Sequence, residues 1–216
     1  MAVVAVVAFR LLEASHRAPA QLALSSNQSG SVSPLAGTWS VASGSQVGYR
    51  AKEKFINQPA ETEAVARTSS VKGSLVVRVD GSTVKVSHMK FTADLASLVS
   101  QDKYANYDVY QRDFFVRRIY LETDSFPTAT FTVDALSFPT PASGPVQVDA
   151  TGKLTVHGAT KVETAHLQAT GSGNDAEIAG SMNVDMRDFG IAPPDISFTR
   201  AEPQLTIEFD LKLLRS

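Results

Sequence analysis

The chain has 216 residues, of which 43% are hydrophobic and 19% charged, and its formal net charge is −2. These values suit one medium-sized domain with additional sequence, since a domain of about 180 residues buries roughly 70% of its unfolded surface. Twenty basic and 22 acidic residues provide no electrostatic attraction for nucleic acid, so no nucleic-acid partner is expected. The absence of cysteine excludes disulfides, thiolate metal sites, cysteine nucleophiles and a lipid-modified N-terminal cysteine.

The N-terminal segment 1–20 begins with an apolar run, MAVVAVVAF. The run is far shorter than the ~20 residues that cross a bilayer. Ala18-Pro19-Ala20 has the small-x-small form of a signal-peptide cleavage site, although charged residues precede it. We interpret residues 1–20 as the remnant of a signal or anchor segment, with a frayed extension as the alternative. This interpretation predicts an extracytoplasmic protein that is secreted, periplasmic or tethered to a membrane through its N-terminus.

Residues 21–37 are rich in serine, glycine and asparagine and show no sustained periodicity. Such a composition buries too little surface to offset the entropy of ordering, which predicts a flexible linker. The folded domain is therefore expected to span residues 38–216.

From Thr38 onward, apolar and polar residues alternate with a period of two, which is typical of strands with one buried face. In 83–95, the alternation predicts Val84, Val86 and His88 on one face and Met89, Phe91 and Ala93 on the other. The same pattern occurs in further segments: 46–52, 74–79, 128–133, 146–156, 160–171, 177–186 and 204–214.

Turn signals separate several of these segments. Asp80-Gly81, His157-Gly158 and Gly171–Asn174 fit short hairpin connections. Eight or so strands with short connections and one apolar face predict an antiparallel barrel or sandwich. Residues 104–122 break the alternation and carry apolar residues at helical spacings, which predicts a helical or irregular crossover near one barrel mouth.

No catalytic or cofactor motif stands out. The four histidines at 16, 88, 157 and 166 include no pair at i, i+4 spacing, and HExxH is absent. A metal site would require His88 and His157 to meet in three dimensions. The chain contains no G-x-S-x-G elbow and no phosphate-binding glycine loop. We therefore expect a non-enzymatic protein without a resident cofactor or metal, although a bound isoprenoid lipid or quinone is compatible with this expectation.

Two questions stay open at the level of residue pattern. Arg112, Arg117 and Arg118 either form a solvated helix face with weak ion pairs or include one arginine that binds an anionic head group. The aromatic residues of an eight-stranded barrel either fill its interior or surround one small ligand. In 128–133 the threonines alternate with Ala129, Phe131 and Val133. This apolar face therefore contacts either the protein's own core or a bound ligand.

Six segments in order resemble successive blocks of the YceI-like family of lipocalin-like polyisoprenoid-binding proteins. They are GTWSVASGSQVGYRAKEKF (37–55), ARTSSVKGSL (66–75), FTADLASLVSQD (91–102), QRDFFVRRIYLETDSFPTATF (111–131), GKLTVHGATK (152–161) and DFGIAPPDI (188–196). The resemblance spans about residues 38–214. Two segments differ from the usual family pattern: the first hairpin ends in Lys52-Glu53-Lys54-Phe55, and Phe114-Phe115-Val116-Arg117 follows Arg112-Asp113.

The resemblance implies an all-β fold, an extended eight-stranded antiparallel lipocalin-like barrel with a helical crossover segment. It also implies export and a hydrophobic tunnel that binds, sequesters or transports a polyisoprenoid or similar amphiphilic lipid. The alternative is a quinone-binding partner of a membrane redox system, and a homodimer is compatible with either. The residues expected to contact the ligand are Phe91, Leu95, Phe114, Phe115, Phe131, Val133, Phe189 and Arg112.

Overall fold

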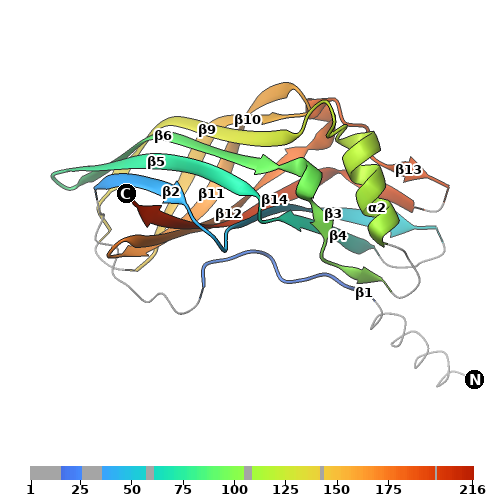
Figure 1. Cartoon of the computed structure of the whole chain (residues 1–216), viewed down its shortest axis with the longest axis horizontal. Helices are drawn as coiled ribbons and strands as arrows, with labels where there is room; N and C mark the ends of the chain where they lie inside the picture. Colours follow the sequence, from blue (N-terminus) through green and yellow to red (C-terminus); the bar gives the residue numbers. More distant parts are fainter. Residues whose placement is uncertain (1–15, 26–35, 57–60, 105–108, 142–143, 198) are drawn as a thin grey trace, which may run out of the picture.

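The main feature of the fold is a closed antiparallel barrel of eight long strands (Figure 1). The computed structural model describes residues 16–25, 36–56, 61–104, 109–141, 144–197 and 199–216. In spatial order the barrel strands are β12 (Asp175–Asp185), β11 (Ala159–Ser172), β10 (Val146–Val156), β9 (Thr128–Pro139), β6 (Thr83–Asp94), β5 (Val71–Asp80), β2 (Gly37–Val41) and β14 (Thr199–Arg215). Pairing of β12 with β14 closes the ring, which confirms the predicted barrel.

The barrel wall divides at one end because β14 is longer than β2. Residues 213–215 of β14 pair with β2, whereas residues 199–210 pair with β3 (Gln46–Phe55). The sheet then continues into β4 (Thr62–Thr68) and β7 (Val99–Ser100). This outward extension widens the barrel at the end where β3 and β4 lie (Figure 1).

Short helical segments cover the widened end. They are η1 (Leu95–Ser97), α2 (Val109–Phe115), the π-helical turn η2 (Val116–Tyr120) and η3 (Met186–Phe189). The segments α2 and η2 confirm the predicted crossover. Two short pairings lie outside the barrel ring: β1 (His16–Arg17) pairs with β8 (Lys103–Tyr104), and β13 (Asp195–Ile196) pairs with β14.

The hairpins follow the turn signals in the sequence. The β10–β11 connection consists of His157 and Gly158 alone, and both have positive φ, +50° and +74°. This is the type I′ geometry, whose twist matches that of the flanking strands. The β5–β6 hairpin turns at Gly81-Ser82, and the β11–β12 hairpin at Gly173-Asn174.

The predicted faces of β6 are wrong in one respect. His88 has a φ of +54°, and the β5–β6 register shifts between Ser74 and Val76. A bulge of this kind inserts one residue and reverses the alternation. As a result Val84, Val86, Met89 and Ala93 are all buried, whereas His88 is exposed.

Part of the predicted flexible linker is bound to the outer barrel wall. Arg50 and Arg67 donate to the carbonyls of Pro19 and Ala20 at 2.8 and 2.6 Å. The Leu22 and Ser25 backbone N–H groups donate to the buried carboxylates of Glu208 and Glu177. Residues 18–25 therefore form an ordered strap, while 1–15 and 26–35 lie outside the described residues. Among the described residues no helix is long and apolar enough to span a bilayer.

Candidate ligand-binding cavity

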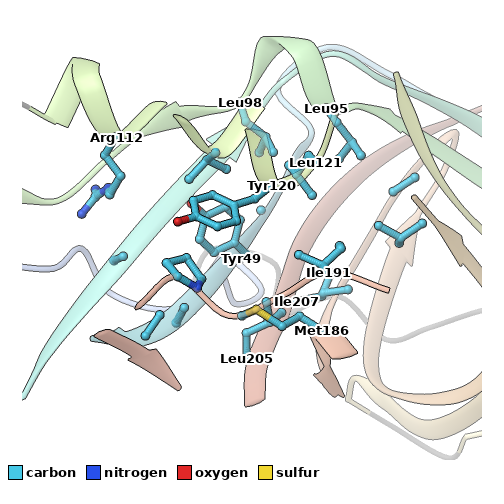
Figure 2. A pocket seen from close by; sticks show the side chains of 18 of the residues that line it. Tyr49, Leu95, Leu98, Arg112, Tyr120, Leu121, Met186, Ile191, Leu205 and Ile207 are labelled. Atoms are coloured by element: carbon cyan, nitrogen blue, oxygen red, sulfur yellow. The ribbon is translucent and has the colours of Figure 1, made fainter. Parts of the chain in front are cut away.

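The widened end of the barrel encloses a cavity of about 450 Å³ (Figure 2). Its wall is mostly aliphatic and comes from strands β3, β4, β10, β12 and β14 together with the covering helices. Ala51, Leu154, Val184, Leu205 and Ile207 are representative strand residues. The volume falls in the range typical of small-molecule sites, and such an apolar wall suits the hydrocarbon part of a ligand.

The mouth of the cavity lies between α2 and β13. Phe115 and Ile196 both line the cavity and are exposed to solvent, by 46% and 39%. A residue that satisfies both conditions marks the boundary between interior and solvent. Tyr110, Phe114 and Ile119 lie on the same helical segment as Phe115 and are 77%, 53% and 59% exposed. The helical segment that borders the mouth therefore presents apolar side chains to solvent.

Two smaller cavities continue along the barrel interior, with volumes of about 80 and 110 Å³. The middle cavity shares Ala93, Ala129 and Ile207 with the main cavity. It shares Met89, Leu167 and Ile178 with the far cavity, which reaches Trp39 and Phe138. The interior is thus a chain of three apolar chambers separated by side-chain constrictions.

Polar groups gather at the mouth end of the main cavity, a set that we call the polar end: Tyr49, Glu53, Arg112 and Thr199. Tyr49 and Glu53 share the inward face of β3, because they lie four residues apart on one strand. Thr199 is the first residue of β14, and Ala201, two residues further along that strand, is paired with Glu53. Figure 2 shows Arg112 on one side of the pocket and Leu95 and Ile191 on the other.

Arg112 is fully engaged within the protein. Its Nη1 donates to Glu53 Oε1 at 3.2 Å and to Asp102 Oδ2 at 3.0 Å. Its Nη2 donates to Asp102 Oδ1 and to Ser100 Oγ, and its Nε also donates to Ser100 Oγ. A guanidinium carries five N–H groups in a fixed fork. Those five are matched by five contacts, which leaves Arg112 without a donor for an anionic head group.

Burial changes the ionisation of the polar end. Desolvation raises the pKa of Glu53 to about 7, although Arg112 opposes the rise. The pKa of Tyr49 is also raised by burial, so its hydroxyl keeps its proton. The Tyr49 hydroxyl and Glu53 Oε2 make no hydrogen bond within the described part of the chain. Thr199 Oγ1 is buried and without a partner among the described residues.

The residues predicted to contact a ligand occupy three kinds of place. Leu95, Arg112, Phe115 and Phe189 line the main cavity, and Phe91 and Phe131 line the middle one. Val133 is buried in the core that surrounds these chambers. Phe114 points to solvent beside the mouth and packs edge-on against Phe115, with ring centroids 5.8 Å apart. The structure thus brings six of the eight residues to a cavity wall.

Sequence reasoning missed Tyr49, Glu53 and Thr199. Tyr49 lies on the predicted inward face of its strand. If the alternation of residues 46–52 is continued by one residue, it places Glu53 on the same inward face. Thr199 gave no signal, because its position follows from the register of β14 against β3.

His88, His157 and His166 lie apart from the walls of the three chambers. His157 contacts Glu122 and the Phe189 carbonyl and packs on Phe126, whereas His166 pairs with Asp149 on the exposed side of β11. No group of three or more metal-binding side chains occurs among the described residues.

The barrel and its apolar chambers define the class of protein: an antiparallel β-barrel with an internal site for a small molecule. The model of the YceI-like domain matches residues 22–213, and the chain belongs to this family. No curated protein sequence matches the chain.

Two solved structures share the fold. A polyisoprenoid-binding domain from Saccharophagus degradans, implicated in plant cell wall breakdown, superposes with a TM-score of 0.56 at 14% identity. The match covers 84% of this chain and all of that one. BcnA of Burkholderia cenocepacia matches with a TM-score of 0.52 at 22% identity, over 78% of this chain and 95% of its own.

Proposed function

We propose that this protein binds a polyisoprenoid or similar amphiphilic lipid and carries or sequesters it without chemical change. The single observation that supports this function most is the series of three apolar chambers along the barrel interior, of which the main one opens between α2 and β13. Each CH₂ group that leaves water contributes about 0.8 kcal/mol before the costs of ordering. A long hydrocarbon chain is the ligand that gains most from such an interior.

The membership of the family and the name of the Saccharophagus degradans domain support an isoprenoid tail. A bound isoprenoid quinone handed to a membrane redox system is the second candidate. The polar end supports this second candidate, because the carbonyl oxygens of a quinone ring accept hydrogen bonds of the kind that the hydroxyls of Tyr49 and Thr199 donate.

Loading and release take place at a membrane surface in this proposal. The apolar side chains of Tyr110, Phe114 and Ile119 beside the mouth support it, because an exposed apolar patch at a ligand mouth suits contact with lipid. We also propose a location outside the cytoplasm, which is the location predicted from the apolar N-terminal run in the sequence. In this proposal the mouth is a point of membrane contact in addition to the predicted N-terminal one.

The test is organic extraction of the purified full chain from a host with its natural lipids, followed by mass spectrometry. One isoprenoid or quinone per protein chain is the expected result. An empty protein that also fails to take up isoprenoid alcohols during incubation would contradict the proposed function.

A further inference from the structure

We infer that the polar end of the cavity selects a neutral head group, a hydroxyl or a carbonyl, and discriminates against a phosphate. This inference rests on the proposed function and specifies the ligand class of the same site. The opposite expectation was reasonable from sequence, since a cavity arginine commonly binds phosphate.

The first argument concerns the donors of Arg112. Its five N–H groups are matched by Ser100, Glu53 and Asp102, and the contact with Asp102 is bidentate. Asp102 is itself fixed by the Val65 backbone N–H, which donates to it at 3.1 Å. A phosphate would have to displace a carboxylate that is held in place on both sides.

The second argument concerns charge. Among the side chains that the structure describes, a buried cluster combines the guanidinium of Arg112 with the carboxyl groups of Glu53, Asp102 and Asp113. Asp113 accepts from the Ser100 backbone N–H and hydroxyl, so it shares a partner with Arg112. Further negative charge in this poorly hydrated region would meet net repulsion and a large desolvation cost. Burial also raises the pKa of Glu53, so this environment already disfavours the ionised form of one of the cluster's own carboxyl groups.

The third argument concerns unused hydrogen-bonding groups. Thr199 is 6% exposed, lines the cavity, and its Oγ1 has no partner among the described residues. The Tyr49 hydroxyl, kept protonated by burial, also lines the cavity. Buried polar groups in proteins nearly always have partners. A hydroxyl or carbonyl group of a ligand provides a hydrogen-bond partner for such groups without adding a charge to the buried cluster.

The test compares two probes that share one tail: a C20 isoprenoid alcohol and its monophosphate. Their dissociation constants for the full chain are measured by calorimetry at pH 7.5. The alcohol is expected to bind at least tenfold more tightly than the phosphate. Equal affinity, or tighter binding of the phosphate, would overturn the inference and leave the proposed function intact. Binding of neither probe would instead reject the proposed function.

Two variants connect the preference to Glu53. In Glu53→Gln, the amide keeps a donor and an acceptor at the site but removes the negative charge. The discrimination against the phosphate, taken as the ratio of the two dissociation constants, is therefore expected to fall at least threefold. Glu202→Gln is the matched control, because Glu202 lies beside Ala201 on β14 but is exposed. A discrimination that is unchanged in Glu53→Gln, or that falls equally in Glu202→Gln, would contradict the role of Glu53.

Discussion

At the scale of single residues, the Arg112 cluster joins the covering helix to the barrel. Arg112 and Asp113 are adjacent on α2, and both bind Ser100 of β7, while Arg112 also reaches Glu53 of β3. Such a network tolerates poorly the loss of one member, because the remaining charges stay buried without a counter-charge. The cluster therefore fixes the position of α2, which covers the cavity, as well as the position of the polar end.

Replacement of Arg112 by methionine is expected to destabilise the fold by about 3–5 kcal/mol, since it removes the guanidinium that bridges the buried carboxyl groups of Asp102 and Glu53. The measurement is urea unfolding at pH 7. Arg118→Met is the control, because Arg118 pairs with Asp124 at the exposed surface, where ion pairs contribute about 1 kcal/mol or less. Similar losses in both variants would contradict the assigned difference between the two pairs.

Glu53 makes stability depend on pH. Its pKa is raised from 4.5 to about 7 in the folded protein, mainly by burial. The folded state then binds the proton more tightly than the unfolded state, so the contribution to stability is full below pH 4.5 and is lost as pH rises to about 7. The loss is on the order of 1–3 kcal/mol.

The comparison that isolates this group is the unfolding free energy of the parent and of Glu53→Gln between pH 4.5 and 8. The difference between the two proteins should shift in favour of the variant as pH rises across this window. A constant difference would show that Glu53 titrates normally in the folded state.

At the scale of elements, residues 128–133 of strand β9 separate the interior from solvent with a period of two. Phe131 lines the middle cavity beside Phe91, its partner on β6, whereas Thr132 reaches the Lys153 carbonyl on the outer side. Phe131→Asp is therefore expected to abolish retention of a bound lipid, because it places a charge against the tail.

Thr132→Asp is the matched control, since it adds the same charge one residue away on the opposite face. It should retain lipid at the parental level. The amount of co-purifying lipid per protein chain is the readout, with circular dichroism to confirm folding. Equal loss in both variants would contradict the face assignment.

The sequence predicted elements well where the pattern is local. The inward residues of β10 and β14 and the presence of a tight turn at His157-Gly158 follow from periodicity and turn residues alone. The bulge at His88 did not, because a positive φ at a non-glycine residue leaves no compositional signal.

The candidate site was predictable in part for the same reason. Apolar residues on regular strands were placed from alternation, and Phe91 and Phe131 do line a cavity. On the helical crossover, neighbouring residues diverge: Phe115 faces the mouth and Phe114 faces solvent. The engagement of Arg112 depends on Glu53 and Asp102, which lie 59 and 10 residues away in the sequence, so only the tertiary structure shows that its N–H groups are all used.

At the scale of the whole molecule, the mouth between α2 and β13 has an apolar rim that suits a lipid surface. Phe114→Ser combined with Ile119→Ser removes apolar surface beside the mouth without touching the cavity wall. The double variant is expected to reduce association with vesicles of phosphatidylethanolamine and phosphatidylglycerol at least fivefold in a flotation assay.

Val162→Ser is the control for that assay, because Val162 is 69% exposed on β11 and does not border the mouth. It should float like the parent. Undiminished association in the double variant, or an equal decrease in the control, would show that the rim is not the contact surface.

The three chambers also predict how affinity depends on tail length. Ala93 and Ala129 are paired across β6 and β9, and together with Val47, Leu154 and Ile207 they line both the main and the middle cavity, so they form one side of the boundary between the two. A tail that extends beyond the main cavity must pass these two small side chains. Ala129→Phe should therefore close the passage, with an overpacking cost of roughly 1–3 kcal/mol in stability.

The measurement is the affinity for isoprenoid alcohols of 10, 15, 20 and 40 carbons. In the parent, affinity should continue to rise with each unit that reaches the deeper chambers, because every buried CH₂ adds to binding. In Ala129→Phe the rise should stop at a shorter tail, while the shortest alcohol binds as in the parent. Ala135→Phe, on the exposed side of β9, should keep the parental dependence. An identical length dependence in all three proteins would mean that the tail never passes the constriction and that the main cavity alone holds the ligand.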